Sequence, residues 1–418
     1  MNRRSSRRRS RSALPFALPE FRKVSLQRLA IVAVLGLGAT WLALALAVSG
    51  AKRTQNPALA LRFMPHESTA LASRADQLLL AKPEDPPQEA RTLALDALRQ
   101  QPLNPRALRV AGYLASAKGD ENTARALIGL AASQSRRDAL TQFFLIEDAV
   151  QRQDVKTALV HYDIALRTKL SAYDTLFPVL LGAIGDPAIR TALSPYIRAN
   201  QAWARAFLSY ANLNSKDLPT LVALILESGG LADPQAAHEQ DVGLLGRLVH
   251  DRLFTDARRL YLHMPGASDA RLGRIGFDAS DQSGQFGAMG WQVSTEPESG
   301  SSFSTGIDHR VSMSLLANAG TFASVATKIL YLKPGRYAFE AQLSSIDAGD
   351  GGFIRWQLRC ARPDGDKAVW ALDSSAKVTK AMVSVPNDCP VQFFDIVASG
   401  GNSQSGMEAT VASLTLRR

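Results

Sequence analysis

The residues that most often carry catalysis or metal binding are sparse in this sequence and lack the spacing that such chemistry needs. None of the six histidines lies four residues from another, and no HExxH arrangement places two zinc ligands on one helix face. The chain also contains no GxSxG, P-loop or GxGxxG pattern. We therefore expect no catalytic residues, no cofactor and no metal site, and a protein that is not an enzyme.

Two aspartates lie in a segment that could bind a metal ion. Asp347 and Asp350 stand in the glycine-rich segment DAGDGG, where carboxylate oxygens can bind Ca²⁺ but where aspartate is also an ordinary turn former. The sequence does not decide between a calcium site and an ordinary turn.

Cys360 and Cys389 are the only cysteines, and no CxxC motif exists. An even pair within one small exported domain predicts a disulfide bond between them.

The positive charge of the chain is concentrated at its N-terminus. The formal net charge is +10, and residues 1–28 contain nine Lys or Arg against Glu20 alone, a balance of +8. The rest of the chain therefore carries only +2, so its surface offers no general attraction to a polyanion. We expect no nucleic-acid partner.

An uncharged apolar segment follows the basic tail. Residues 29–51 would form about 34 Å of helix, enough to cross a bilayer core of about 30 Å. The preceding positive charge predicts a cytoplasmic tail (1–28), a single-pass membrane anchor (29–51) and a remainder on the far side of the membrane. The alternative is a cleavable signal peptide, with Ala47-Val48-Ser49 resembling a cleavage site, but its apolar core would normally be shorter.

After a tether at 52–65, the segment 66–264 is rich in alanine and leucine and shows a repeat of 34 residues. Small residues recur at that period in two series, Ala90, Ala124, Ala158, Ala192 and Ala97, Ala131, Ala165, Ala199. Antiparallel helices that pack closely need such small residues where they cross. The period and residue types resemble the tetratricopeptide repeat (TPR), so we expect an α-helical solenoid.

The TPR resemblance implies a groove formed by the first helix of each repeat, with exposed side chains that bind a peptide or helix of a protein partner. By position, the residues expected to line this groove are Arg106, Arg109, Tyr113, Ser116, Leu140, Phe143 and Glu147.

Beyond a Gly/Ser/Asp-rich linker at 265–280, residues 281–418 change to alternating patterns typical of strands. Eight or nine short strands predict an antiparallel β-sandwich or jelly roll. In sugar-binding jelly rolls a polar sheet face with aromatic rings is the binding surface. The candidate residues for such a face here are Arg336, Arg355, Gln357, Arg359 and Trp370.

The complete arrangement resembles membrane-anchored TPR proteins of Gram-negative envelopes that carry a C-terminal carbohydrate-binding-like sandwich. That resemblance implies an assembly factor in secretion or exopolysaccharide machinery. Our leading hypothesis is a non-enzymatic periplasmic scaffold that holds a protein partner in its groove. The alternative is a polysaccharide-binding protein that uses the sandwich, and an envelope enzyme with an unrecognised site is the third possibility.

Overall fold

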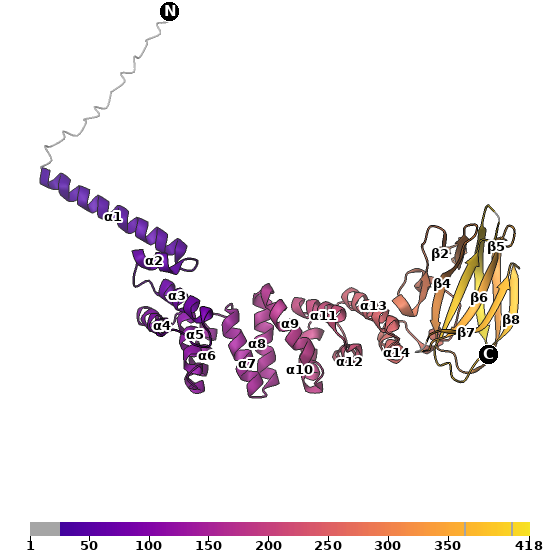
Figure 1. The fold of residues 1–418 in the computed structure, drawn as a ribbon, viewed down its shortest axis with the longest axis horizontal. Coiled ribbons are helices and arrows are strands. Elements are labelled where there is room, and N and C mark those ends of the chain that lie inside the picture. The colour runs from indigo at the N-terminus through magenta and orange to yellow at the C-terminus, as the bar shows by residue number, and fades with distance from the viewer. Residues whose placement is uncertain (1–25, 363–364, 403) are drawn as a thin grey trace, which may run out of the picture. The chain divides into compact units, whose positions relative to one another are not determined.

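The computed structural model describes residues 26–362, 365–402 and 404–418 (Figure 1). The chain divides into two compact units, Met1–Leu145 and Ile146–Arg418. Nearly all of the tail that the sequence predicts to be cytoplasmic, at 1–28, lies outside the described residues. A helical N-terminal region and a C-terminal antiparallel sandwich confirm the predicted multidomain fold class.

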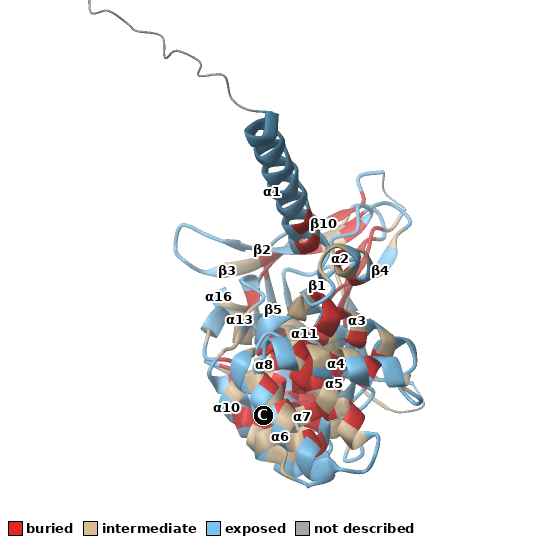
Figure 2. Cartoon of the chain, turned by 90° about the vertical axis from the view of Figure 1, so that its left-hand side faces the viewer, coloured by how far each residue is buried: buried red, intermediate tan, exposed pale blue. Residues whose placement is uncertain are grey.

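The first helix is the one described helix that is long and apolar enough to cross a membrane. This helix, α1 (Leu26–Lys52), is exposed along most of its length (Figure 2). An exposed apolar surface of this size is unusual in water and is the normal condition of a helix in lipid. A signal sequence near the N-terminus can pass the same test of length and apolar composition, so the predicted topology remains a prediction. The short helix α2 (Pro57–Phe63) follows, started by the Asn56 side chain.

The first unit continues with helices joined by short turns. Asn104 and Asp120 begin two of them by accepting a hydrogen bond from a backbone N–H of the first turn. Ala90, Ala97, Ala124 and Ala131 of the periodic series are all fully buried. Gly112 lets α5 and α6 approach closely, because a Cβ there would lie 2.5 Å from Ile128 Cγ1. The helices are α3 (Ser68–Ala81), α4 (Gln88–Gln100), α5 (Pro105–Ser116), α6 (Glu121–Gln134) and α7 (Ala139–Gln151), the last of which reaches into the second unit.

The helical pattern continues in the second unit. Ala158 and Ala165 are buried as expected, but Ala199 is exposed because it is the C-cap of α10 and lies beyond the helix body. The helix pairs are therefore confirmed, whereas membership of the TPR family remains a prediction. The helices are α8 (Val155–Thr168), α9 (Tyr173–Ala183), α10 (Pro187–Arg198), α11 (Ala202–Asn214), α12 (Leu218–Ser228), α13 (Pro234–His250) and α14 (Phe254–His263).

One carboxyl group in this helical region is buried without a partner among the described residues. Asp241 on α13 is 7% exposed, and desolvation raises its pKa to about 7. Because the folded-state pKa lies above the unfolded value, folding favours the protonated form. Its stabilising contribution is complete below about pH 4 and is lost as the pH rises through about 7.

We expect Asp241→Asn to remove this pH dependence. Relative to the variant, the unmodified chain should lose about 2 kcal/mol of unfolding free energy between about pH 5 and about pH 8. Denaturant unfolding at several pH values measures the effect. Asp174→Asn, at an exposed position of α9, should retain the wild-type pH profile. If the unfolding free energies of the unmodified chain and of Asp241→Asn change with pH in the same way, the raised pKa of Asp241 is contradicted.

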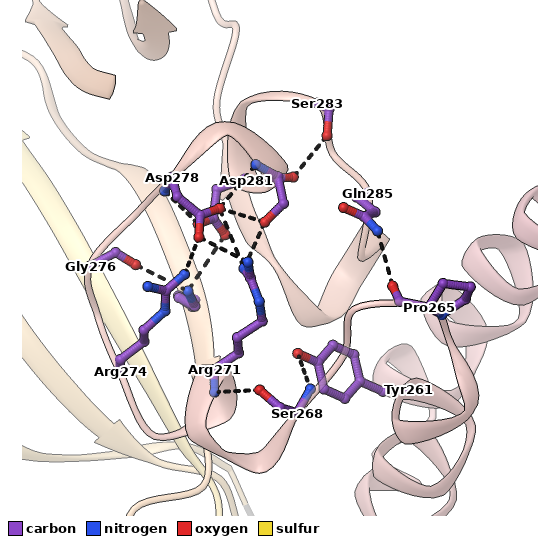
Figure 3. A network of polar contacts seen from close by, with 12 residues as sticks. Tyr261, Pro265, Ser268, Arg271, Arg274, Gly276, Asp278, Asp281, Ser283 and Gln285 are labelled. Atoms are coloured by element: carbon purple, nitrogen blue, oxygen red, sulfur yellow. Dashed lines mark hydrogen bonds and ion pairs between the residues drawn. The ribbon is translucent and has the colours of Figure 1, made fainter. Parts of the chain in front are cut away.

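The segment between α14 and the first strand is ordered by a dense polar network (Figure 3). Arg271 and Arg274 both bind the carboxylate of Asp278, and the pKa of Asp278 is strongly lowered because its hydrogen bonds outweigh its desolvation. Asp281 forms an ion pair of 3.6 Å with the buried Lys328 of the sandwich. These contacts fix the two short helices of the segment, α15 (Asp269–Leu272) and α16 (Ala279–Gln282), and the 3₁₀ turn η2 (Gly287–Met289).

The C-terminal part is a sandwich of two five-stranded antiparallel sheets. Sheet A has the order β1-β4-β9-β6-β7 and sheet B the order β2-β3-β10-β5-β8. Apart from the β2–β3 and β6–β7 hairpins, successive strands alternate between the sheets, as in jelly rolls. The strands are β1 (Trp291–Val293), β2 (Ser299–Thr305), β3 (Val311–Ala317), β4 (Phe322–Leu330), β5 (Gly335–Asp347), β6 (Phe353–Cys360), β7 (Lys367–Ser374), β8 (Val378–Val385), β9 (Gln392–Ser399) and β10 (Met407–Arg417).

The sandwich core contains one apolar cluster drawn from both sheets, including Phe339, Trp356 and Phe394. The predicted bond between Cys360 and Cys389 is confirmed, and both residues are fully buried at the edge of this core. The bond ties the end of β6 to the turn before β9, two segments that are neighbours in sheet A.

Candidate functional site

The four residues of the predicted helical groove that lie on α5 are all engaged within the chain. Arg106 donates to Ser73, and Ser116 donates to Glu121 at 2.9 Å. The Tyr113 hydroxyl donates to the carbonyl of Leu140 at 3.1 Å, and its ring packs edge-on against Phe144. These contacts join α5 to neighbouring helices and leave little of the expected lining free for a partner.

The expectation that Arg109 is exposed is wrong. Its side chain is 2% exposed, with the guanidinium group bound to Asp76 by two hydrogen bonds of 2.9 Å and to Asp138 at 2.6 Å. Burial disfavours the charge, but the two carboxylates outweigh it and raise the pKa of Arg109. Arg109 therefore connects α3, α5 and the start of α7 and is not available to a partner.

The remaining predicted groove residues lie on α7. Leu140 and Phe143 are half-buried, whereas Glu147 is exposed. A cavity beside α5 is lined by residues that include Leu114 and Leu127, and one beside the end of α7 by residues that include Val150 and Leu159; neither lining contains a predicted groove residue. Their role in partner binding stays a prediction.

The predicted glycan-binding residues do not form one surface. Arg355, Gln357 and Arg359 alternate on the outer face of β6 in sheet A, whereas Arg336 lies on β5 in sheet B. Trp370 packs against Phe339, with ring centroids 5.2 Å apart, so its ring faces the core. Grouping Arg336 and Trp370 with the β6 residues was wrong, because strand parity fixes a face only within one sheet.

The outer face of sheet A carries one exposed and one partly buried aromatic ring that the sequence prediction missed. Phe322 on β4 and Phe353 on β6 both pair with Ser399 of the central strand β9, so their side chains flank the same point. The two ring centroids are 6.1 Å apart, and Phe322 is 53% exposed. We call the surface formed by Phe322, Phe353, Arg355, Gln357 and Asp373 the aromatic–arginine face.

Arg355 occupies the centre of this face. Its guanidinium group lies 5.0 Å from the ring of Phe322 and 5.8 Å from that of Phe353. It also binds Asp373 of β7 through hydrogen bonds of 2.6 and 2.7 Å. This pairing raises the pKa of Arg355 and lowers that of Asp373, so both groups stay charged across the physiological pH range.

The other end of the same sheet face is covered by the helical region. Arg359 binds Asp395 and Asp366, and its guanidinium group lies over the ring of Phe393. Phe254 of α14 packs edge-on against Phe393 at 5.9 Å, and Arg252 reaches Asp366 at 2.7 Å. The aromatic–arginine face is thus an open platform bounded at one end by the α13–α14 turn.

The predicted calcium candidates show ordinary turn contacts. The Asp347 carboxylate accepts from the backbone N–H of Gly349, and the Asp350 carbonyl accepts from Asn402. Among the described residues, no group of three or more metal-ligating side chains converges on one point.

Comparisons with known proteins give only weak likenesses. No protein-family model matches the chain, and no curated protein matches it. A solved structure of the carbohydrate-binding module CBM4 shares 15% identity over 34% of this chain and 85% of its own, with a TM-score of 0.21. A chain in the crystal structure of accessory secretory proteins 1, 2 and 3 of Streptococcus pneumoniae shares 14% identity over 30% of this chain and 90% of its own, with a TM-score of 0.21.

The carbohydrate-binding module TmCBM61, solved with β-1,4-galactotriose, shares 11% identity over 31% of this chain and 88% of its own, with a TM-score of 0.18. Because all three TM-scores are low, these likenesses carry no argument about function.

Proposed function

We propose that this chain is a non-enzymatic, membrane-anchored protein of the cell envelope that binds a polysaccharide on the aromatic–arginine face of its sandwich. The observation that carries the proposal is the surface cluster of Phe322, which is exposed, with the partly buried Phe353 and Arg355, the latter held in place by Asp373. This reverses the order of our two sequence-based hypotheses, because the α5 side of the groove is occupied by internal contacts.

The chemistry of the face suits a sugar ring. One side of a pyranose presents C–H groups, which pack on exposed aromatic rings and gain apolar contact. Its hydroxyl groups both donate and accept hydrogen bonds, so they match a surface that offers both functions. Arg355 supplies donors, Asp373 supplies acceptors, and Gln357 supplies one of each kind of group.

The charges of the face favour a neutral glycan. Arg355 is paired with Asp373, Arg359 with Asp395, and Arg252 with Asp366. A surface whose cations are already paired gives little net attraction to an acidic polymer. We therefore expect binding that varies little with ionic strength.

The proposal also assigns roles to the other regions of the chain. In the proposal α1 anchors the chain in the inner membrane, and the helix pairs serve as a scaffold that presents the sandwich in the periplasm. The disulfide bond is consistent with an oxidising compartment. A protein partner, contacting exposed positions such as Glu147, remains part of the proposal.

We expect Phe322→Ala/Phe353→Ala to weaken polysaccharide binding on the order of 10- to 100-fold, the combined loss of two apolar contacts. Affinity electrophoresis of the full-length chain in detergent, through gels containing a series of neutral polysaccharides, measures the change. The variant should fold normally because Phe322 projects from the sheet surface and Phe353 is only partly buried.

The matched control is Met382→Ala. Met382 is also 53% exposed but lies on β8, in the opposite sheet, so its loss should not change retention. Equal retention of the Phe double variant and the Met382 variant, in a gel that retards the unmodified chain, would show that the sugar binds elsewhere. Retardation by none of the polysaccharides would refute the proposed function.

A further inference from the structure

A second surface in the same unit carries a positive charge that is unpaired within the described chain, whereas the charges of the aromatic–arginine face are paired. It is a pocket of about 690 Å³ formed where α14 and the segment after it meet the β4–β5 turn of the sandwich. Its lining includes Arg258, Asp269, Tyr331, Lys333, Pro334 and Tyr337. Ligand pockets for small molecules have volumes of about 300–1,000 Å³, so this one can hold a sugar residue.

The walls of the pocket are fixed by contacts on both sides. On the helical side, Arg258 binds Asp269 at 2.7 Å, and Arg271 and Arg274 hold the neighbouring segment through Asp278 (Figure 3). On the sandwich side, the Tyr331 hydroxyl donates to the carbonyl of Phe254 at 2.7 Å. The site is therefore preformed, which lowers the entropy cost of binding.

Among the residues that the structure describes, the pocket has one unpaired cation in its lining, because Arg258 is bound to Asp269 and Lys333 is not paired. Lys333 is exposed and has no carboxylate partner among the described residues. Just outside the lining, the Arg418 guanidinium group donates to the carbonyl of Pro334. Arg336 is not part of this pocket, because it alternates with the inward-facing Tyr337 on β5 and so lies on the outer face of sheet B. Asp269 is the one acidic side chain of the lining, and it is bound to Arg258.

The aromatic and apolar part of the lining indicates what carries the negative charge. Arg258 lies 5.9 Å from the centre of the Tyr331 ring, and Pro334, Tyr337 and Pro390 continue the apolar wall. A ring-shaped ligand gains contact with such a wall, while its carboxylate or phosphate group pairs with Lys333 at the rim. A simple inorganic anion would pair with Lys333 but would not contact the aromatic and apolar wall.

From this combination we infer a separate binding site for an acidic sugar residue, one that carries a carboxylate or phosphate group, between α14 and the β4–β5 turn. The inference uses no residue of the aromatic–arginine face. The two sites together would let one sandwich hold a neutral stretch and an acidic unit of a glycan, or two different glycans.

The test measures binding of a glucuronic-acid oligosaccharide to the full-length chain in detergent, by titration calorimetry, with a neutral glucose oligomer of the same length as reference. We expect the acidic oligomer to bind more tightly, and its affinity to fall about ten-fold or more between low and high salt. Lys333→Glu should abolish this binding, and Lys333→Arg should retain it. Lys377→Glu makes the same change of charge at an exposed turn between β7 and β8 and should have no effect.

Several outcomes would overturn the inference. If Lys333→Glu and Lys377→Glu lose the same amount of acidic-oligomer binding, the oligomer is attracted by the net charge of the protein and not by a specific site. Loss of acidic-oligomer binding in Phe322→Ala/Phe353→Ala would place the ligand on the aromatic–arginine face. If inorganic phosphate competes as strongly as the acidic oligomer does, the pocket is a simple anion site. If the chain binds anionic phospholipid vesicles but not the oligomer, the ligand is a membrane surface. Failure of the neutral-glycan experiment alone would leave this inference standing, since the two sites share no residue.

Discussion

Replacing Arg109 with Met should cost about 3–5 kcal/mol of unfolding free energy, the largest effect that we expect from one substitution. The change leaves the Asp138 carboxylate without its arginine partner and the Asp76 carboxylate with only Arg106, at 3.7 Å, beside a position where the Arg109 side chain is 2% exposed. Uncompensated buried charge is far more costly than the loss of a surface ion pair. Hydrogen exchange of peptides from α3 and α5 in the full-length chain measures the loss.

Two further variants separate charge from packing. Arg99→Ala removes an exposed arginine that pairs with Asp96, and it should cost no more than about 1 kcal/mol. Adding Asp76→Asn and Asp138→Asn to Arg109→Met should recover part of the stability, because no unpaired carboxylate then remains. If Arg109→Met is no more destabilising than Arg99→Ala, the buried ion-pair assignment fails.

Removing the Cys360–Cys389 bond should destabilise the sandwich by about 3–4 kcal/mol in the chain-entropy description of a loop of this length. The loop spans 29 residues in sequence and contains β7 and β8, the edge strands of the two sheets. In Cys360→Ala/Cys389→Ala, we therefore expect faster amide exchange in these strands.

The helices of the first unit are the internal control for the disulfide experiment. Amide exchange of α3 to α6 should not change, since the bond lies wholly within the sandwich. Adding a reductant to the unmodified chain should reproduce the effect of the double variant, and reductant should have no further effect on that variant. Unchanged exchange in β7 and β8 would show that the bond contributes little to stability.

The elements of the fold were largely predictable because their signals are local. The alternation of apolar and polar residues over 353–360 predicts β6 and its inward-facing residues, and the 34-residue alanine period predicts the helix pairs. Strand β2, with the sequence SGSSFST, is not predictable from its own residues, because serine and glycine give no apolar alternation and are typical of loops. Its place in the sheet comes from pairing with β3, a tertiary contact.

The candidate site was less predictable because it depends on which strands become neighbours. Arg355 was identified from strand parity, but the partners Phe322 and Asp373 lie on β4 and β7, and only the sheet order brings them close to Arg355. Arg109 was assigned to an exposed groove because its position on a helix cannot reveal two acidic partners, Asp76 on α3 and Asp138 just before α7. The spacing of 33 residues from Asp76 and 29 from Asp138, near the repeat length, was the available signal.

The central claim is that the aromatic–arginine face binds a neutral glycan, and carbene footprinting of the full-length chain tests it most directly. Labelling of the exposed surface is compared with and without a neutral polysaccharide that retards the protein. We predict protection of the peptides that contain Phe322 and Phe353, with no change at Met382 on the opposite sheet. Protection at Met382, or on the helices, with Phe322 and Phe353 still fully labelled, would contradict the account.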